Sequence, residues 1–586
     1  MSMNKNIRFT LSSLLLGASI LLPASSYASA AQLSAEPQGQ PTESGLESRT
    51  FGTPIESSED SRVEDSRVED PPVEDPPVED PPVESKSDAT APAWKPEQID
   101  AYANAARERL HIPGLAVGIV QNGEVVYMQG YGSAGPGAGP MTPQTPLAIG
   151  STSKSLTALA VMQLVEQGKI KLDAPVTDYL PDFRLADAAQ SARITVADLL
   201  NQTSGLSTYD GIAFLARGDG TIMQHIQRLR EVVQTQPAGA GYQYSNLNYN
   251  ILGAIVQQVS GQSYGDYMEQ QIFRPLGMSH SFSSPERAQA AMAETSDLRP
   301  PSGHQSLFGL SVPTRQGEHS ATVPSGYLVS TAEDMSKYLL MQMEGGSLNG
   351  TTLLDREGIA KMHESTVSIG DGSFYGMGWQ KTGDYTWHNG ITENTYSEMR
   401  IRGDHGIFIL ANSADQLMIS YADILPGIDD ILRGQTPSIE SLPDYNKLYG
   451  IADGIAIAVA LLFLGSIRSL FRWKKAFRPV PWKITVNLLL LLACNVALPL
   501  AILHVTLPLA PWQVVATWAP GIGWMAITLP WMLFATGALK LLLMLVAMGI
   551  ARREKRRAAR AEKQAAASGD SGLSERPPFN DMEFGA

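Results

Sequence analysis

The chain contains 586 residues, carries a formal net charge of −15 and has one cysteine, Cys494. This length predicts two or more structural units. A single cysteine excludes an intrachain disulfide, so a folded domain must be held by its core. Much of the negative charge lies in residues 31–93, so the net charge says little about a substrate.

The first 30 residues have the pattern of a secretory signal peptide. Lys5 and Arg8 supply positive charge, an apolar stretch follows, and residues 28–30 are the small residues that precede a cleavage site. We therefore expect residues 1–30 to be a signal peptide. An uncleaved membrane anchor is the alternative.

Residues 31–93 contain five-residue repeats rich in proline, valine and acidic residues. Residues 61–70 hold two copies of Ser-Arg-Val-Glu-Asp, and the copies that follow begin with paired prolines. Proline removes backbone donors, the charges repel, and there is too little apolar surface for a core. We expect a disordered, extended spacer without chemistry; a cation-binding or wall-interacting segment is the alternative.

Ser151 and Lys154 form an S-x-x-K motif at the start of an apolar segment. The residues from Leu156 to Val165 have helical spacing, and no Gly or Pro interrupts them. A helix that begins at Ser151 places both side chains on one face, one turn apart. Its N-terminus favours negative charge, and burial would lower the pKa of the lysine. The motif alone also occurs by chance, as an ordinary helix start.

Two further motifs follow along the chain. Tyr244-Ser245-Asn246 comes after a glycine-rich loop and before an apolar helical stretch, so Tyr244 and Asn246 can point into one cleft. His388-Asn389-Gly390 has the pattern of a strand edge where a substrate backbone could approach closely. A hydrogen-bonded core tyrosine and a structural histidine are the alternatives for Tyr244 and His388.

In this order and at these separations, the motifs resemble those of the serine β-lactamase and penicillin-binding protein superfamily. The class C-like branch, with its D-alanyl-D-alanine carboxypeptidase and esterase relatives, is the most similar. The likeness runs roughly from Trp94 to Gly434. His388-Asn389-Gly390 stands where other members have K-T-G. Gln202 departs from the family, whose members usually have histidine before Thr-Ser-Gly.

The resemblance implies an α/β, β-lactamase-like fold for residues 94–435, in which an antiparallel sheet is flanked by helices and carries a helical lobe. It implies that Ser151 attacks a carbonyl and forms an acyl-enzyme, and that Lys154 and Tyr244 share the role of base. The backbone N–H groups of Ser151 and Ile391 would hold the oxyanion. The other substrate-binding candidates in these motifs are Asn246, His388 and Gly390.

Alternation and turn residues predict several elements of this domain. Residues 115–120 and 124–131 form a hairpin around Asn122-Gly123. Further strands are expected around residues 386–388, 396–401 and 406–411. The last helix of the domain is expected over residues 416–432.

Three apolar stretches near the C-terminus, residues 448–467, 484–505 and 524–550, are each long enough to cross a bilayer. Lys and Arg are abundant between the first two and after the third, and absent around residues 508–520. The positive-inside rule then places the hydrolase domain outside the cell membrane and a basic, disordered tail, residues 551–586, inside. Four spans with an external tail are the alternative.

This layout resembles that of the antibiotic- and colibactin-maturing periplasmic peptidases, which remove an acylated D-asparagine cap from a prodrug. Asn394, just after the His388 strand, and the Trp518-Ala519-Pro520 turn add to the likeness. Asn246 and Ala148 depart from it, because the colibactin enzyme has serine and glutamate at these places. The D-asparagine pocket is therefore not transferred to this chain, although Asn394 is kept as a substrate-binding candidate.

We expect a membrane-anchored, extracytoplasmic serine hydrolase that acts on a peptide, D-amino-acid amide or ester. A mostly neutral His388 in place of the K-T-G lysine argues against efficient β-lactam hydrolysis. A prodrug-activating D-amino-acyl peptidase and a β-lactam receptor that acylates without turnover are the alternatives. The expected partners are membrane lipid and a small-molecule or peptide substrate, either cell-wall-derived or secreted. No nucleic acid, cofactor or metal is expected.

Overall fold

The computed structural model describes residues 94–215, 218–295, 299–415, 418–506 and 511–567. In this part of the chain the central element is a nine-stranded antiparallel sheet, in the order β10-β11-β12-β13-β14-β15-β1-β2-β3. Its strands are β1 (Gly114–Gln121), β2 (Glu124–Gly135), β3 (Gly139–Pro140), β10 (Val367–Gly370), β11 (Ser373–Gly376), β12 (Trp379–Thr382), β13 (Tyr385–Ile391), β14 (Tyr396–Arg402) and β15 (His405–Ala411).

The predicted hairpin and strands are confirmed. β1 and β2 pair around Asn122 and Gly123, whose φ angles of 53° and 82° fit a tight two-residue turn. β13, β14 and β15 cover the three further strands expected from the sequence, and they are neighbours in the sheet. The predicted fold class, an antiparallel sheet with flanking helices and a helical lobe, is therefore correct.

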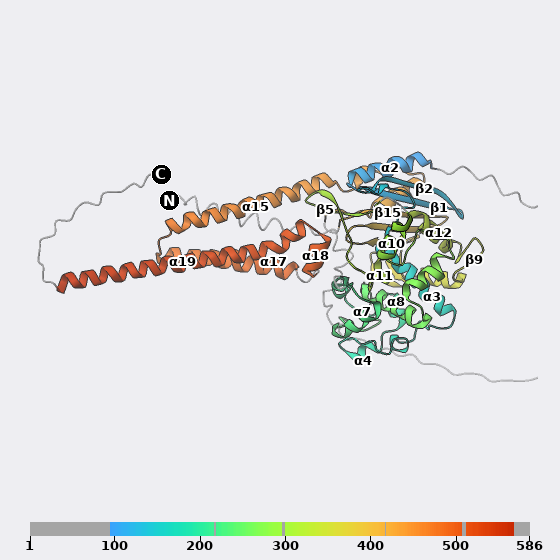
Figure 1. The fold of residues 1–586 in the computed structure, drawn as a ribbon, viewed down its shortest axis with the longest axis horizontal. Coiled ribbons are helices and arrows are strands. Elements are labelled where there is room, and N and C mark those ends of the chain that lie inside the picture. Colours follow the sequence, from blue (N-terminus) through green and yellow to red (C-terminus); the bar gives the residue numbers. More distant parts are fainter. Residues whose placement is uncertain (1–93, 216–217, 296–298, 416–417, 507–510, 568–586) are drawn as a thin grey trace, which may run out of the picture.

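Each face of the sheet buries its own core, because side chains alternate along the strands. In β15, Phe408 and Leu410 pack with α3 (Ser153–Glu166), α8 (Asn246–Ser260) and α12 (Ala332–Met343). Ile407 and Ile409 face the opposite way and pack with α2 (Pro96–Arg109) and α14 (Ile424–Leu432). Figure 1 shows α2 along one face of the sheet, and the lobe with α3 and α8 beyond the other.

The last helix of the domain is shorter than predicted. We expected it over residues 416–432, whereas α14 begins at Ile424. Pro426 explains the difference, because proline is tolerated in the first turn of a helix but not in its interior. Before α14, the Asp415 carboxylate accepts the Met418 N–H at 2.9 Å and favours a turn.

The helical lobe is built around α3, whose residues from Ser153 to Leu164 are all buried. Its apolar residues surround the helix on every side, as expected of a helix in the interior of a domain. The other helices of the folded domain are α4 (Ala188–Ser191), α5 (Val196–Leu200), α6 (Thr208–Ala213), α7 (Ile222–Arg228), α9 (Tyr264–Met268), α10 (Pro285–Thr295), α11 (Val323–Gly326) and α13 (Arg356–His363).

Short strands complete the domain. β5 (Gly303–Leu307) and β6 (Leu310–Thr314) form a hairpin, and β16 (Ser413–Ala414) adds to β5 in parallel. Two small ladders join β4 (Leu147–Ala148) to β7 (Val329–Ser330) and β8 (Ser347–Leu348) to β9 (Thr351–Thr352). The β4–β7 ladder leads directly into the segment that carries Ser151.

Long helices extend from one end of the domain (Figure 1). They are α15 (Tyr445–Ala476), α16 (Pro481–Leu492), α17 (Leu498–Thr506), the short α18 (Trp512–Trp518) and α19 (Ile522–Ala567). Among the described residues, three helical stretches are long and apolar enough to cross a membrane: Ile439–Gly465, Pro481–His504 and Ile522–Ala567. They contain or largely cover the three stretches expected from the sequence.

The tail differs from the prediction. We expected disorder from residue 551, but α19 continues as a helix to Ala567. Residues 551–567 consist only of Ala, Arg, Lys, Glu and Gln, which are all strong helix formers. The expected signal peptide, residues 1–30, and the expected spacer, residues 31–93, lie outside the described residues.

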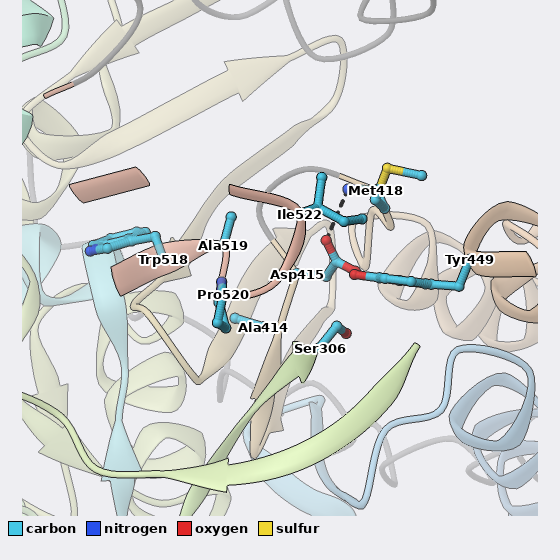
Figure 2. A pocket seen from close by; sticks show the side chains of 9 residues that line it. All are labelled: Ser306, Ala414, Asp415, Met418, Tyr449, Trp518, Ala519, Pro520 and Ile522. Atoms are coloured by element: carbon cyan, nitrogen blue, oxygen red, sulfur yellow. Dashed lines mark hydrogen bonds between the residues drawn. The ribbon is translucent and has the colours of Figure 1, made fainter. Parts of the chain in front are cut away.

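The long helices contact the domain at a small pocket lined by Ser306, Ala414, Asp415, Met418, Tyr449, Trp518, Ala519, Pro520 and Ile522. Figure 2 shows the Tyr449 hydroxyl beside the Asp415 carboxylate, to which it donates a hydrogen bond of 2.7 Å. Gln305 Nε2 on β5 also donates to the Thr517 carbonyl of α18, at 2.6 Å. These contacts join α15 and α18 to the β5–β16 edge of the domain.

Candidate active site

Ser151 lies in a single 3₁₀ turn, Gly150–Thr152, that leads into α3. The sequence predicted an α-helix that begins at Ser151, and the structure places the first α-helical residue at Ser153. The two side chains still lie together, as their spacing predicted: Lys154 Nζ lies 2.9 Å from Ser151 Oγ. Ser151 is partly exposed, whereas Ser153 is completely buried.

Lys154 is buried among neutral groups. Its Nζ lies 2.9 Å from Ser151 Oγ, 2.9 Å from Asn246 Oδ1 and 2.5 Å from the Ser325 carbonyl oxygen. Within the described residues Lys154 takes part in no ion pair, and its side chain is 0% exposed. Burial without a counterion lowers the pKa of Lys154 well below its ordinary value.

The three acceptors around Lys154 define what its neutral form can do. A neutral amine has two N–H donors and one lone pair, and both the Asn246 and Ser325 oxygens can only accept. When these two oxygens take the two N–H groups, the lone pair is left facing the Ser151 hydroxyl. The arrangement therefore suits a lysine that accepts the proton of Ser151.

Tyr244 approaches Ser151 from a second direction. Its hydroxyl lies 2.7 Å from Ser151 Oγ, and burial raises the pKa of Tyr244 well above its usual range. A phenol with a raised pKa stays protonated and donates to Ser151 Oγ. Of the two candidate bases, Lys154 is thus the group whose pKa shift favours accepting a proton.

Gln202, the departure from the family pattern, holds the Tyr244 loop in place. It adopts a φ of 60°, is fully buried, and its side-chain oxygen accepts the Ser245 N–H at 2.9 Å. Its backbone oxygen accepts the Gln243 N–H at 2.8 Å. An amide oxygen suffices for these bonds, so replacing the usual histidine preserves the support of this loop.

His388 is buried beside the site and does not carry charge. Burial is the main cause that lowers the pKa of His388 to about 3. Its Nδ1 lies 2.6 Å from the Asn389 carbonyl oxygen, and Nε2 is buried without a hydrogen-bond partner in the described residues. The Tyr375 ring lies edge-on to His388 at 6.0 Å and edge-on to Tyr244 at 6.4 Å. The Tyr375 ring therefore packs against both Tyr244 and His388.

Two glycines bring the backbones of Ser151 and Ile391 close together. A Cβ on Gly150 would lie 2.3 Å from Ile391 N, and a Cβ on Gly390 would lie 2.8 Å from Ser151 N. Both distances are shorter than a carbon atom allows, so any side chain here would force β13 away from the turn. The backbone nitrogens of Ser151 and Ile391 therefore lie close together, which the predicted oxyanion site requires.

Asn394, predicted to bind substrate, makes structural contacts in the fold. It is 1% exposed, and its Nδ2 donates to the Thr314 carbonyl oxygen at 3.0 Å. Its own carbonyl accepts the His304 N–H at 3.1 Å. The side chain thus fastens the loop after β13 to the β5–β6 hairpin.

Sequence reasoning missed two contributors. The Ser325 carbonyl that contacts Lys154 belongs to the backbone, so no residue type could reveal it. Glu393, two residues after Ile391, accepts hydrogen bonds from His319 Nε2 at 3.0 Å and from the Tyr327 hydroxyl at 3.1 Å. Tyr327 follows α11, the helix that carries Ser325, so this cluster connects the Ile391 loop to the support of Lys154.

One group in the described residues has the geometry of metal ligands. Atoms of His280, Glu333 and Asp334 lie within 4.8 Å of one another. Lys337 Nζ, however, lies 3.2 Å from Glu333 and 3.0 Å from Asp334. The ammonium group forms an ion pair with each of these carboxylates, so they belong to an ion-pair network.

Comparisons with known proteins agree with this geometry. A model of the Beta-lactamase family matches residues 99–422. The chain is similar to penicillin-binding protein 4 of Amycolatopsis lactamdurans, with 29% identity over 323 residues, 52% of this chain and 81% of the relative. It is also similar to protein flp of Staphylococcus aureus strain COL, with 24% identity over 444 residues, 72% of this chain and 86% of the relative.

A solved structure is similar as well. The octameric penicillin-binding protein homologue from Pyrococcus abyssi superposes with a TM-score of 0.50 and is 26% identical. The likeness covers 58% of this chain and 78% of that one. The family match ends at residue 422, before the long C-terminal helices that begin with α15 at Tyr445.

Proposed function

The chain belongs to the beta-lactamase family of serine hydrolases, and we propose that it is a membrane-anchored, extracytoplasmic hydrolase that forms an acyl-enzyme at Ser151. One observation carries the proposal: Ser151 Oγ lies between Lys154 Nζ at 2.9 Å and the Tyr244 hydroxyl at 2.7 Å. A partly exposed serine with a candidate base and a candidate acid in contact has the arrangement of an activated nucleophile.

In the proposed reaction, Ser151 Oγ attacks the substrate carbonyl carbon while its proton passes to neutral Lys154. The N–H groups of Ser151 and Ile391 stabilise the oxyanion; one such donor lowers the barrier by about 2.7–4 kcal/mol in other enzymes. The leaving amine or alcohol takes a proton from Tyr244, which Lys154 reprotonates. Water then attacks the ester carbonyl carbon while Lys154 accepts its proton. Lys154 passes this proton to Ser151 Oγ as the Oγ–acyl bond breaks, which releases the carboxylic acid product and restores free Ser151 and neutral Lys154.

The neutral state of His388 bears on the substrate. A pKa of about 3 means that the imidazole offers no positive charge to a substrate carboxylate at neutral pH. Penicillin-recognising enzymes of the family supply that charge from the K-T-G lysine. We therefore propose a peptide, D-amino-acid amide or ester as substrate in preference to a β-lactam. The Thr314 contact of Asn394 gives no support to a D-asparagine pocket.

The proposed anchoring rests on the three long apolar helices and their flanking charges. The segment from Arg468 to Lys483, which covers the end of α15 and the start of α16, and the end of α19 are rich in Lys and Arg, which favours the cytoplasmic side for both. Cysteine accessibility labelling in a Cys494→Ala background tests this topology. Positions in residues 466–483 and in the tail should be protected in intact cells, and a tail labelled from outside would contradict three spans.

Mass spectrometry of the full chain after exposure to a fluorophosphonate tests the nucleophile. Ser151 should carry the adduct, and Ser151→Ala should abolish it. Ser153 and Ser245 are both fully buried and serve as internal controls. An adduct on either of them would overturn the assignment. A panel of D-alanyl peptides, D-asparaginyl amides, short esters and β-lactams then separates substrates that turn over from those that only acylate.

A further inference from the structure

The turn of the β5–β6 hairpin carries apolar side chains that its fold does not require. Phe308 and Gly309 occupy the two turn positions with φ angles of 49° and 71°. Such turns favour Asn, Asp or Gly, and a bulky aromatic residue with positive φ is uncommon. Phe308 is nevertheless 41% exposed, and Leu310, the next residue but one, is 67% exposed.

This turn lies beside the ends of two candidate spans. A Cβ on Gly309 would lie 3.2 Å from Tyr449 Cβ, in the second turn of α15. A Cβ on Gly521, the residue before α19, would lie 3.2 Å from the Phe308 ring. Figure 1 shows β5 at the end of the domain from which α15 and α18 extend.

The surroundings of the turn have the composition of a membrane–water interface. Trp512 at the start of α18 and Trp524 near the start of α19 are 54% and 50% exposed. Tryptophan is enriched where spans leave the bilayer. Ile451, just after Tyr449 in α15, is 54% exposed, so the apolar surface of the turn continues onto the outward faces of the helices.

We propose that the β5–β6 turn inserts Phe308 and Leu310 into the lipid leaflet that borders the hydrolase domain. The inference rests on the proposed anchoring and adds a contact between the domain itself and lipid. It explains why an aromatic residue occupies a turn position that disfavours it. The proposed occupant of this surface is the bilayer, which the adjoining helices α15 and α19 are long and apolar enough to cross.

The base of the same hairpin supports the active site. The carbonyl oxygen of Thr314, at the end of β6, accepts a hydrogen bond from Asn394 Nδ2. The backbone N–H of His304, in β5, donates to the Asn394 carbonyl oxygen. Five residues per strand at about 3.3 Å each make the hairpin about 16 Å long. The proposed contact therefore holds the loop after Ile391 close to the membrane surface. The substrate class that fits is an amide or ester presented at that surface, such as one attached to a lipid.

Depth-dependent fluorescence quenching of the full chain in proteoliposomes tests the proposal. Single cysteines are introduced in a Cys494→Ala background as Phe308→Cys, Leu310→Cys, Val126→Cys and Leu542→Cys, and each is labelled with an environment-sensitive fluorophore. Phosphatidylethanolamine–phosphatidylglycerol vesicles carry spin-labelled lipid, and iodide probes exposure to water. Thermal melting of each labelled protein checks that it is folded.

Two positions serve as matched controls. Val126 is 40% exposed, close to the value of Phe308, and follows the β1–β2 turn. Gln121, at the β1–β2 turn, pairs with His405 at the start of β15. Ala411, at the other end of β15, leads to β16 and the β5–β6 hairpin, so Val126 lies at the end of the sheet away from the long helices. Leu542 is 57% exposed within α19 and reports whether the spans are in lipid.

We expect spin-labelled lipid to quench Phe308→Cys and Leu310→Cys at least twofold more than Val126→Cys, and iodide to do the reverse. Quenching of Leu542→Cys by lipid, with Phe308→Cys and Leu310→Cys behaving like Val126→Cys, would overturn the hairpin contact and leave the anchoring intact. Protection of both turn positions from lipid and iodide would indicate a protein partner or a second copy and would also overturn it. An unquenched Leu542→Cys would overturn the anchoring together with this inference.

Discussion

Two buried ionisable groups, Lys154 and Asp429, lie on opposite faces of the central sheet, and their surroundings are opposite in kind. On the α3 face, Lys154 has only neutral oxygens around it, from Ser151, Asn246 and Ser325. On the α14 face, Asp429 is surrounded by cations: Arg400 at 3.4 Å, His405 at 2.8 Å, and Arg402 and Arg433 in further ion pairs.

The difference separates a site built for chemistry from one built for stability. Burial alone would raise the pKa of Asp429, but the hydrogen bond from His405 and the arginine charges outweigh it and lower the pKa. Asp429 therefore stays charged and fixes α14 to the sheet. Lys154 has no such compensation, so its neutral form is favoured, and a neutral amine beside a serine can act as a base.

Replacing Lys154, which has no counterion, should have the largest effect on activity. Lys154→Met keeps the length of the side chain and removes the base, so the rate of acylation at Ser151 should fall by about 10³-fold or more. Because residues of one catalytic unit act non-additively, adding Lys154→Met to Ser151→Ala should cost little further. Stopped-flow labelling with an activated ester measures the rate. A loss of less than tenfold would show that Tyr244 is the main base.

Replacing Asp429, whose charge is balanced by arginines and His405, should instead lower the stability of the fold. Asp429→Asn leaves Arg400, Arg402 and His405 without their common anion, and we expect a loss of about 3–5 kcal/mol. A depressed carboxyl pKa contributes stability that is present above the unfolded pKa and is lost as pH falls through the folded value. The difference between wild type and variant in denaturant melts should therefore shrink in acid. Equal loss at every pH would contradict the ion-pair account.

The pH dependence of stability should distinguish the two sites further. Lys154 has a lowered pKa in the folded state, so between that value and about 10.5 the unfolded chain binds more protons, and stability rises with pH. The slope from one group is at most about 1.4 kcal/mol per pH unit. Lys154→Met should remove this slope in thermal melts between pH 6 and 9. An unchanged slope would mean that Lys154 is charged in the folded protein.

His388 should have the smallest effect. Because its pKa of about 3 keeps it neutral, it contributes no titration between pH 5 and 8. His388→Gln should leave the shape of the pH–rate profile unchanged in that range, with a loss of rate within about tenfold from altered packing against Tyr375. A midpoint near pH 6.5 that disappears in the variant would show that the imidazole titrates.

The two sites also differ in how far the sequence could predict them. Ser151 and Lys154 are three residues apart, in a 3₁₀ turn that continues directly into α3, so local spacing was enough to place them together. Tyr244 and His388 were found through the order of motifs. Their connection through Tyr375 was not predicted, because it depends on packing between distant segments.

Backbone groups and long-range pairs escaped prediction. The Ser325 carbonyl has no side-chain signal, and the partners of Asp429 come from β14, β15 and α14. Asn394 was assigned to the substrate because it follows the His388 strand, but its contact with Thr314 requires the β5–β6 hairpin. Hydrophobic stretches were reliable for the candidate spans, whereas charge alone was a poor guide to the helical end of α19.

The central claim is that Lys154 acts as a neutral base because it lacks a counterion, and Asn246→Asp tests it most directly. The substitution places a carboxylate where an amide oxygen lies 2.9 Å from Lys154 Nζ, with Asn246→Gln as the neutral control. An adjacent carboxylate raises the pKa of a lysine by about 1–3 units. The midpoint of the acylation rate against pH should therefore move upward in Asn246→Asp and stay in place in Asn246→Gln. A midpoint that does not move in Asn246→Asp would contradict the account.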